Sequence, residues 1–320
     1  MSEPETWAGD IIERHRMYGW SEPGGEVGAV YDDYRTVFRS ALGSGDGVFV
    51  EAVLANMMRL PLSTSLTSEP RSAPGRSDWE VQLERRGLLA GHLALWVMVS
   101  DDADVERLRC GNAGNPMLMA IERRSGERVP VAVDSFRFDS YAQRIARVIP
   151  SFGTVLEIGP GYGGLAIQLL RILPSARIVL CDLPETLYLA GYILDHEPSI
   201  DVAWWDEGNP SANVILLPEK DLEAWTEPID LVFSAHSLSN MGRVNTARYM
   251  DWLERSGPRY FYHDDATKVI GGAWMTDTYP ELLASEMGVP SCYVEQWCER
   301  IPWTGLDDRF CEFFYERASG

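Results

Sequence analysis

Strand-like and helix-like patterns of apolar residues alternate through the second half of the chain. Short, mostly apolar runs at Thr154–Ile158 and Arg177–Leu180 predict two buried parallel strands. Between them, Leu165, Leu169 and Leu173 share one helical stripe, which predicts a helix that packs back onto the sheet. The same reasoning predicts strands at Asn213–Leu217, Asp230–Ser234 and Arg259–His263 and helices at Ser135–Ile149, Leu187–Leu194, Thr246–Arg255 and around Pro280–Met287. Such alternation indicates a doubly wound parallel sheet.

The C-terminal segment has a different pattern. Cys292–Trp303 and Arg309–Arg317 are both strand-like, and the five residues between them have the length of a hairpin turn. The predicted fold class is therefore α/β: a Rossmann-like sheet of parallel strands that ends in a C-terminal antiparallel hairpin.

The first part of the chain is predicted to be mainly helical. Helical spacing of apolar residues covers Trp7–Met17, Glu26–Leu42, Asp46–Leu60 and Trp79–Ser100. The second half of the last helix is apolar nearly all round and is expected to be buried. Two short apolar runs, Met117–Ile121 and Val129–Val133, predict a small hairpin. We place a boundary near Asp134, between a helical N-terminal domain (1–134) and a sheet domain (135–320).

A glycine-rich turn follows the first strand of the sheet. Gly159, Gly161, Gly163 and Gly164 allow a sharp backbone turn and the close approach of a ligand. Their spacing also satisfies the dinucleotide-binding pattern, with an acid, Asp182, about twenty residues further on. That acid follows the second strand, where a carboxylate can accept hydrogen bonds from a ribose.

Glu157 helps to distinguish a ligand that carries phosphate groups from one that does not. A carboxylate just before the first glycine repels a pyrophosphate, which needs uncompensated N–H groups at the helix N-terminus. S-adenosylmethionine has no phosphate, and its ammonium and sulfonium groups are attracted by a nearby acid. The pattern therefore favours a methyl donor over a nicotinamide dinucleotide.

The net charge and the cysteine content limit which binding partners and which cellular compartment are expected for the protein. The 320-residue chain has a formal net charge of −20, so neither nucleic acid nor an anionic membrane surface is expected as a partner. The five cysteines form no C-x-x-C pair, which argues against a disulfide framework and favours a reducing cytoplasm. The acidic, polar start MSEPETWAGD does not have the pattern of a signal peptide. A small-molecule acceptor in the cytoplasm is the expected partner.

The motifs together resemble a known family. VLEIGPGYGGLA and CDLPET resemble the class I S-adenosylmethionine-dependent methyltransferases, and with the upstream GNP and the string IDLVFSAHSLSNM they resemble the bacterial sugar O-methyltransferases of antibiotic pathways. The resemblance covers about residues 111 to 320. It implies that the donor's methionine part is held by Glu157 and the backbone of Gly159, Gly161 and Gly163, and its ribose by Asp182, with Leu183 and Ser234 completing the site. Glu219 and Asp221 are both candidates for a further acid that meets the adenine.

Two histidines are candidates for the general base that an alcohol acceptor needs. His236 and His263 follow or end strands at the edge of the sheet where such groups gather. We favour His236, because the resemblance implies that its loop faces the methyl group. In the alternative, His236 only braces its loop through Ser234, Ser237 or Asn240.

His263, Asp264 and Asp265 also suggest a divalent metal site. Carboxylate oxygens suit Mg²⁺, which could orient two sugar hydroxyls and acidify one. Adjacent strand residues point to opposite faces, so either His263 with Asp265 or Asp264 alone could face one ion. In the alternative, Asp264 and Asp265 are ordinary solvent-exposed turn residues.

The function expected from the sequence is S-adenosylmethionine-dependent O-methylation of a sugar or a glycosylated natural product, as in antibiotic biosynthesis. The alternatives are a C- or N-methyltransferase on another small metabolite, a nicotinamide-dependent oxidoreductase, and a binding protein without catalysis. The helical N-terminal domain is expected to cover the acceptor pocket and is a candidate for forming a homodimer.

Overall fold

One eight-stranded sheet organises the protein. The computed structural model describes residues 7–20, 28–60, 77–100, 103–209, 211–268, 282–300 and 310–318. The strand order is β5-β6-β4-β3-β7-β8-β10-β9. The strands are β3 (Thr154–Ile158), β4 (Arg177–Asp182), β5 (Val202–Trp204), β6 (Val214–Pro218), β7 (Leu231–Ala235), β8 (Tyr260–Ala266), β9 (Tyr293–Arg300) and β10 (Phe310–Arg317).

The predicted parallel sheet and its antiparallel ending are both confirmed. All pairings from β5 to β8 are parallel, whereas β10 runs antiparallel to both β8 and β9. The predicted turn between β9 and β10 lies outside the described residues. The sequence patterns missed β5, a three-residue edge strand that ends in the buried Trp204. So short a run carries no readable alternation of apolar and polar positions.

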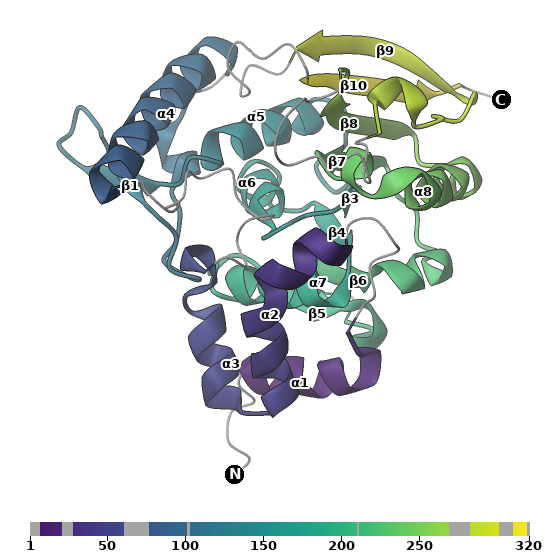
Figure 1. The fold of residues 1–320 in the computed structure, drawn as a ribbon. Coiled ribbons are helices and arrows are strands. Elements are labelled where there is room, and N and C mark those ends of the chain that lie inside the picture. The colour runs from purple at the N-terminus through teal and green to yellow at the C-terminus, as the bar shows by residue number, and fades with distance from the viewer. Residues whose placement is uncertain are drawn as a thin grey trace.

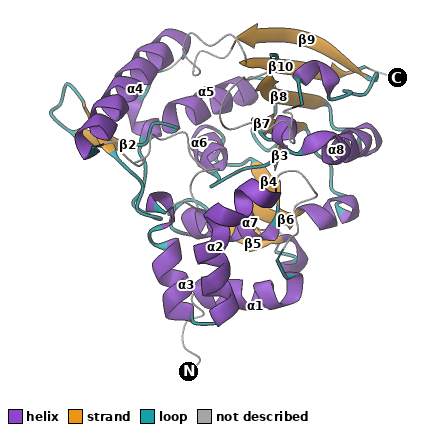
Figure 2. Cartoon of the chain, in the orientation of Figure 1, coloured by secondary structure: helices purple, strands orange, loops and turns teal. Residues whose placement is uncertain are grey.

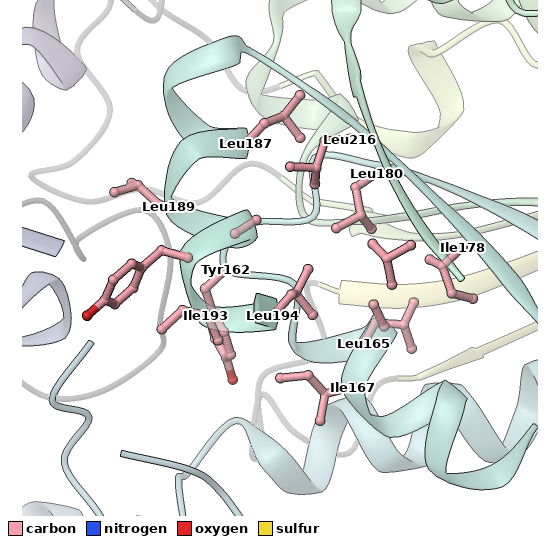
Figure 3. Packing of buried hydrophobic residues seen from close by; sticks show 14 of the residues in the cluster. Tyr162, Leu165, Ile167, Ile178, Leu180, Leu187, Leu189, Ile193, Leu194 and Leu216 are labelled. Carbon is pink, nitrogen blue, oxygen red and sulfur yellow. The ribbon is translucent and has the colours of Figure 1, made fainter. Parts of the chain in front are cut away.

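Helices cover both faces of the sheet (Figure 1; Figure 2). One face carries α5 (Ser135–Ala146), α6 (Gly164–Ile172) and α7 (Pro184–Asp195), and their apolar residues form one core cluster with the strands. Figure 3 shows this packing, in which Leu165 of α6 and Leu194 of α7 lie near Leu180 of β4. The opposite face is covered by α8 (Gly242–Ser256), which belongs to a second cluster.

The first three helices join the core of the sheet domain. They are α1 (Trp7–Tyr18), α2 (Gly28–Ser44) and α3 (Gly47–Leu54), and their buried apolar residues belong to the same cluster as α7. The Trp7 indole donates a hydrogen bond to the Tyr188 carbonyl at 3.3 Å. Gly191 leaves room for this contact, since a Cβ there would lie 2.2 Å from the Trp7 ring.

The next part of the chain contains α4 (Asp78–Val99) and the hairpin of β1 (Met119–Glu122) and β2 (Arg128–Val131). The predicted hairpin is confirmed by its antiparallel register. The expected burial of the second half of α4 is wrong. Trp96 is fully buried, but the Val97 and Met98 side chains remain 56% and 80% exposed. Among the described residues, one side of the helix packs against the rest of the chain, through Trp96 and its neighbours.

One further prediction concerns the helix expected near the C-terminus. The last predicted helix falls partly outside the described residues, and its described part contains a single 3₁₀ turn, Ala284–Glu286. Within the described ranges, no helix has the length and apolarity needed to cross a bilayer.

Candidate active site

Four parallel strands bring most of the predicted site residues to one edge of the sheet. Parallel strands of an open α/β sheet place their carboxyl ends together, and the loops after them form the usual ligand site. Here β3 ends at the glycine turn, β4 ends at Asp182, β7 is followed by His236, and β8 extends to Ala266. Ser234 of β7 pairs with Ile158 of β3, so their strand ends are adjacent.

The glycine turn has the backbone conformation that the sequence predicted. Gly159, Gly161 and Gly163 have φ angles of +72°, +58° and +82°, which other residues rarely adopt. A Cβ on Gly159 would lie 2.1 Å from the Ser237 hydroxyl oxygen, so the loop after β7 packs directly on this turn. The Ser237 hydroxyl donates to the Gly159 carbonyl at 3.1 Å.

Glu157 is a buried carboxyl with unused hydrogen-bonding capacity. Its residue exposure is 2%, and Oε2 has no hydrogen-bond partner among the described residues. Burial, with the nearby Asp182 charge as a second cause, raises its pKa to about 8, and Arg137 partly opposes the shift. A buried carboxyl of this kind is suited to a cationic ligand, because a positive charge replaces the solvation that burial removed.

Asp182 is the last residue of β4 and lies beside the start of α7. Its Oδ1 accepts a hydrogen bond from the Leu183 backbone N–H at 2.7 Å. Burial raises its pKa to about 7, against the effects of this bond and of Arg35. Of the two candidates for the further acid, Glu219 also raises the pKa of Asp182. Asp221 instead accepts from the Trp205 indole at 3.3 Å. The structure therefore favours Glu219 as the acid nearer Asp182.

Ser234 contributes a second polar atom without a partner. It is fully buried at the end of β7, and its hydroxyl oxygen has no hydrogen-bond partner in the described part of the chain. Its side chain points to the face of the sheet opposite that of Glu157, because Glu157 pairs with Phe233 whereas Ser234 pairs with Ile158. The two unpartnered polar groups therefore lie at the same edge of the sheet but on different faces, and each needs a partner of its own.

His236 and Asp264 form a close pair next to this site. His236 Nε2 lies 3.0 Å from Asp264 Oδ1, and the His236 backbone N–H donates to the Asp264 carbonyl at 2.9 Å. The Asp264 side chain is fully buried, whereas the His236 side chain is 24% exposed. The His236 backbone has a φ of +53°, a left-handed conformation that is uncommon for a residue with a side chain. Asn240 Nδ2 donates to the His236 carbonyl at 2.6 Å, as the loop-bracing alternative expects, while the imidazole contacts Asp264 and the Phe310 ring at a centroid distance of 4.6 Å.

Helix α5, which carries none of the predicted site residues, contributes a hydrogen-bond partner to Asp264. The Tyr141 hydroxyl of α5 donates a hydrogen bond to Asp264 Oδ2. Burial raises the pKa of Asp264, but His236, Arg137 and Tyr141 more than offset this, so its pKa lies below the usual value. Sequence reasoning missed Tyr141 and Arg137. Their signal was a spacing of four residues in the helix before the first strand, which places them on one face.

His263 lies on the opposite face of β8. It is fully buried, its Nδ1 lies 2.9 Å from Asp265 Oδ2, and Asp265 Oδ1 accepts from the Ser239 backbone N–H at 3.1 Å. Its imidazole stacks on the Phe261 and Phe313 rings at centroid distances of 4.9 Å. The structure thus separates the two candidate bases, and only His236 is partly exposed.

The two aspartates proposed as metal ligands are likewise separated. Asp264 contacts His236 and Tyr141 on one face, and Asp265 contacts His263 on the other. The described residues contain no group of three or more His, Cys, Asp or Glu side chains that could hold a metal ion. The alternative of solvent-exposed turn residues is wrong, because β8 extends through Ala266 and buries both side chains completely.

Comparisons with known proteins give only distant likenesses. No protein-family model and no curated protein matches the chain. Three of the similar solved structures are methyltransferases by name. The magnesium protoporphyrin IX methyltransferase ChlM of Synechocystis PCC 6803, with bound SAH, is 14% identical with a TM-score of 0.41, covering 57% of this chain and 82% of that one. The glycopeptide N-methyltransferase MtfA, complexed with sinefungin, is 15% identical with a TM-score of 0.42, and the match covers 57% of this chain and 87% of that one. An S-adenosylmethionine dependent methyltransferase from Mesorhizobium loti is 13% identical with a TM-score of 0.37, and the match covers 56% of this chain and 100% of that one. Similarity at this level identifies neither the reaction nor the substrate of this chain.

Proposed function

We propose that this chain is an S-adenosylmethionine-dependent O-methyltransferase that acts on a hydroxyl of a sugar or a glycosylated small natural product. The proposal rests on the arrangement of side chains at one edge of the sheet. There, the buried carboxyl of Glu157, whose Oε2 has no partner among the described residues, precedes three glycines of positive φ, and the His236–Asp264 pair lies at the ends of the next two strands, β7 and β8. The first feature suits a cationic donor, and the second suits removal of a proton from an acceptor.

The donor side is assigned to residues that fit it. Glu157 would accept from the ammonium group, the glycine turn leaves its backbone accessible, and Ser234 offers an unused hydroxyl. Asp182 and Leu183 would hold the ribose end, because an acid beyond the second strand can accept from both hydroxyls. When bound, S-adenosylmethionine supplies a methyl group that passes to the acceptor oxygen as its carbon–sulfur bond breaks, leaving S-adenosylhomocysteine.

On the acceptor side, His236 is the proposed general base. Its Nε2 faces Asp264, so Nδ1 is the ring nitrogen that takes the proton of the acceptor hydroxyl. Asp264 fixes the ring and stabilises the imidazolium that forms, and Tyr141 holds Asp264 in place. After the reaction, the imidazolium returns its proton to solvent through the exposed part of the side chain.

Residues 1–134 are proposed to cover the acceptor pocket. Arg35 of α2 reaches the start of α7 and pairs with Glu185 Oε1 at 3.1 Å. This contact brings the N-terminal helices close to Asp182, at the proposed ribose end of the donor, and the cover over the acceptor is proposed as their continuation. A sugar acceptor is favoured by the family resemblance of residues 111–320, and a homodimer in the cytoplasm is part of the same proposal.

Calorimetry and product analysis test the proposal. The purified chain should bind S-adenosylmethionine and S-adenosylhomocysteine, and it should not bind NAD. Tight NAD binding without either of the other two would contradict a methyltransferase. A panel of glycosylated acceptors, incubated with isotope-labelled donor, should give a product with the label on oxygen. Label on carbon or nitrogen would instead identify one of the alternative methyltransferases.

The metal question has its own test. Asp264 and Asp265 face opposite sides of β8, and neither Asp264 nor the His263–Asp265 pair belongs to a group of three or more possible ligands among the described residues, so EDTA should leave turnover unchanged. Loss of activity in EDTA with recovery on adding Mg²⁺ would restore the metal hypothesis.

A further inference from the structure

Arg137 is a mostly buried cation at the donor edge and has few hydrogen-bond partners among the described residues. It lies in the first turn of α5, and its side chain is 17% exposed. Nη2 makes one long contact, 3.5 Å, with Asp134 Oδ1. Nε is buried and has no hydrogen-bond partner among the described residues. A guanidinium has five N–H donors, so this side chain retains capacity for an anionic group.

The guanidinium stays charged in this position. Burial lowers the pKa of Arg137, but Asp134, Tyr141 and Asp264 more than compensate, and the net pKa is raised. Its positive charge in turn lowers the pKa of Glu157. Arg137 is therefore close enough to interact with both the donor-side carboxyl and the His236–Asp264 pair.

Packing of the neighbouring Phe138 places Arg137 near the glycine turn. Its Cζ lies over the Phe138 ring, 5.2 Å from the centroid. Phe138 contacts the Tyr162 ring at 5.6 Å, and a Cβ on Gly164 would lie 2.5 Å from Phe138. The first turn of α5 thus packs directly on the start of α6, where the glycine turn ends.

Charge complementarity identifies the group that this cation would bind. The methionyl end of the proposed donor is a zwitterion with an ammonium and a carboxylate. Glu157 suits the ammonium, but a carboxylate among these acids requires a cation. Arg35, the other buried arginine near this edge, already contacts Glu185 and Thr186 at 3.1 Å each and lies on the Asp182 side.

We propose that Arg137 binds the α-carboxylate of the methyl donor, so that Glu157 and Arg137 together recognise its amino-acid zwitterion. This inference rests on the proposed function. The experiment also distinguishes two alternative roles. In one, Arg137 only neutralises the charge of Asp134; in the other, it binds a carboxylate on an acidic acceptor.

The experiment compares two ligands that differ by one group, S-adenosylmethionine and decarboxylated S-adenosylmethionine. Calorimetric dissociation constants for both are measured on the wild type, Arg137→Met, Arg137→Lys and a control, Arg144→Met. Arg144 lies on the same helix but pairs with Glu299 and Glu312 at the hairpin. The ratio of the two constants is taken within each variant, so a general loss of stability affects both measurements and cancels.

We expect Arg137→Met to weaken S-adenosylmethionine binding by about 30-fold, the effect of losing a charge-assisted contact, and to leave decarboxylated S-adenosylmethionine unchanged. Arg137→Lys should recover part of the loss, because it keeps the charge but not the planar fork. Arg144→Met should keep the wild-type ratio.

Three results would overturn the inference. Equal weakening of both ligands by Arg137→Met would show a structural role through Asp134. Unchanged donor binding with a raised KM for an acidic acceptor alone would assign the guanidinium to the acceptor. A wild type that binds neither ligand would remove the proposed function itself, and with it this inference.

Discussion

His236 and Asp264 meet twice, once through the side chains, with Nε2 3.0 Å from Oδ1, and once through the backbone, with the His236 N–H 2.9 Å from the Asp264 carbonyl. The double contact fixes the imidazole relative to β8 even though the His236 backbone is in the left-handed region. A strained residue held by its surroundings is common at functional sites. The two contacts therefore keep the ring beside the Asp264 carboxylate.

Replacing either of the two histidines should have different consequences. His236→Ala is expected to lower kcat by about 10²–10⁴-fold, the usual contribution of a general base, with the Kd of S-adenosylhomocysteine unchanged. His263→Asn should instead lower the melting temperature, because this ring is fully buried and stacked on the hairpin aromatics, and leave the kcat of the folded protein unchanged. Steady-state kinetics and thermal unfolding of both variants check this. Equal kcat in His236→Ala and the wild type would remove His236 as the base.

The hydroxyl of Tyr141 should matter for turnover, and that of Tyr262 should not. Both tyrosines are buried and donate to buried acids, Tyr141 to Asp264 and Tyr262 to Glu312 on the hairpin. Tyr141→Phe loosens the carboxylate that orients His236, so kcat should fall by about tenfold, the value of one hydrogen bond to a charged group. Tyr262→Phe is the matched control and should change stability only. A similar fall of kcat in both variants would mean that neither tyrosine acts through Asp264.

Glu157 should destabilise the ligand-free protein at alkaline pH. Its pKa rises from 4.5 unfolded to about 8 folded, so stability is full below pH 4.5 and is lost as the pH rises through about 8. Glu157→Gln cannot ionise and avoids this loss. At pH 8.5 it should exceed the wild type in unfolding free energy by an amount on the order of a few kcal/mol, and by little at pH 5. Denaturant unfolding at the two pH values measures the difference.

The same Glu157→Gln variant should bind S-adenosylmethionine more weakly, since the amide carries no charge for the ammonium. A gain of stability with a loss of donor affinity is the expected trade-off at a binding site. A stability gain of equal size at both pH values would contradict the assigned pKa. Unchanged donor affinity would contradict the role of this carboxyl in binding.

Gly159→Ala should cost more stability than Gly208→Ala. Both glycines have positive φ, +72° and +63°, and share the backbone penalty of roughly 1–2 kcal/mol. A Cβ on Gly208 meets nothing within 4 Å, whereas one on Gly159 meets the Ser237 hydroxyl. Adding Ser237→Gly to Gly159→Ala should reduce its cost to that of Gly208→Ala, which a double-mutant cycle of unfolding free energies measures. Absence of coupling would show that Ser237 does not pack on the glycine turn.

The main elements of the fold were predictable because they depend on local patterns. The apolar strand Thr154–Ile158, the glycines after it and the stripe of α6 lie within a few residues of one another, so their periods and spacing can be read directly. The hairpin β9–β10 was predicted for the same reason. The edge strand β5 and the exposed side of α4 were missed, because burial there depends on which neighbours the rest of the chain supplies.

The sequence by itself determined the glycine turn, the acids Glu157 and Asp182 beside it, and the strands that carry His236 and His263. Only the tertiary structure decided how these groups are used. The alternation of β8 places Asp264 and Asp265 on opposite faces, and packing of α5 on one of them gives Asp264 its partner Tyr141, which is 123 residues away in the sequence. A strand's pattern shows that neighbouring side chains diverge, but it does not show which helix covers each face. That choice separates the partly exposed His236 from the buried His263.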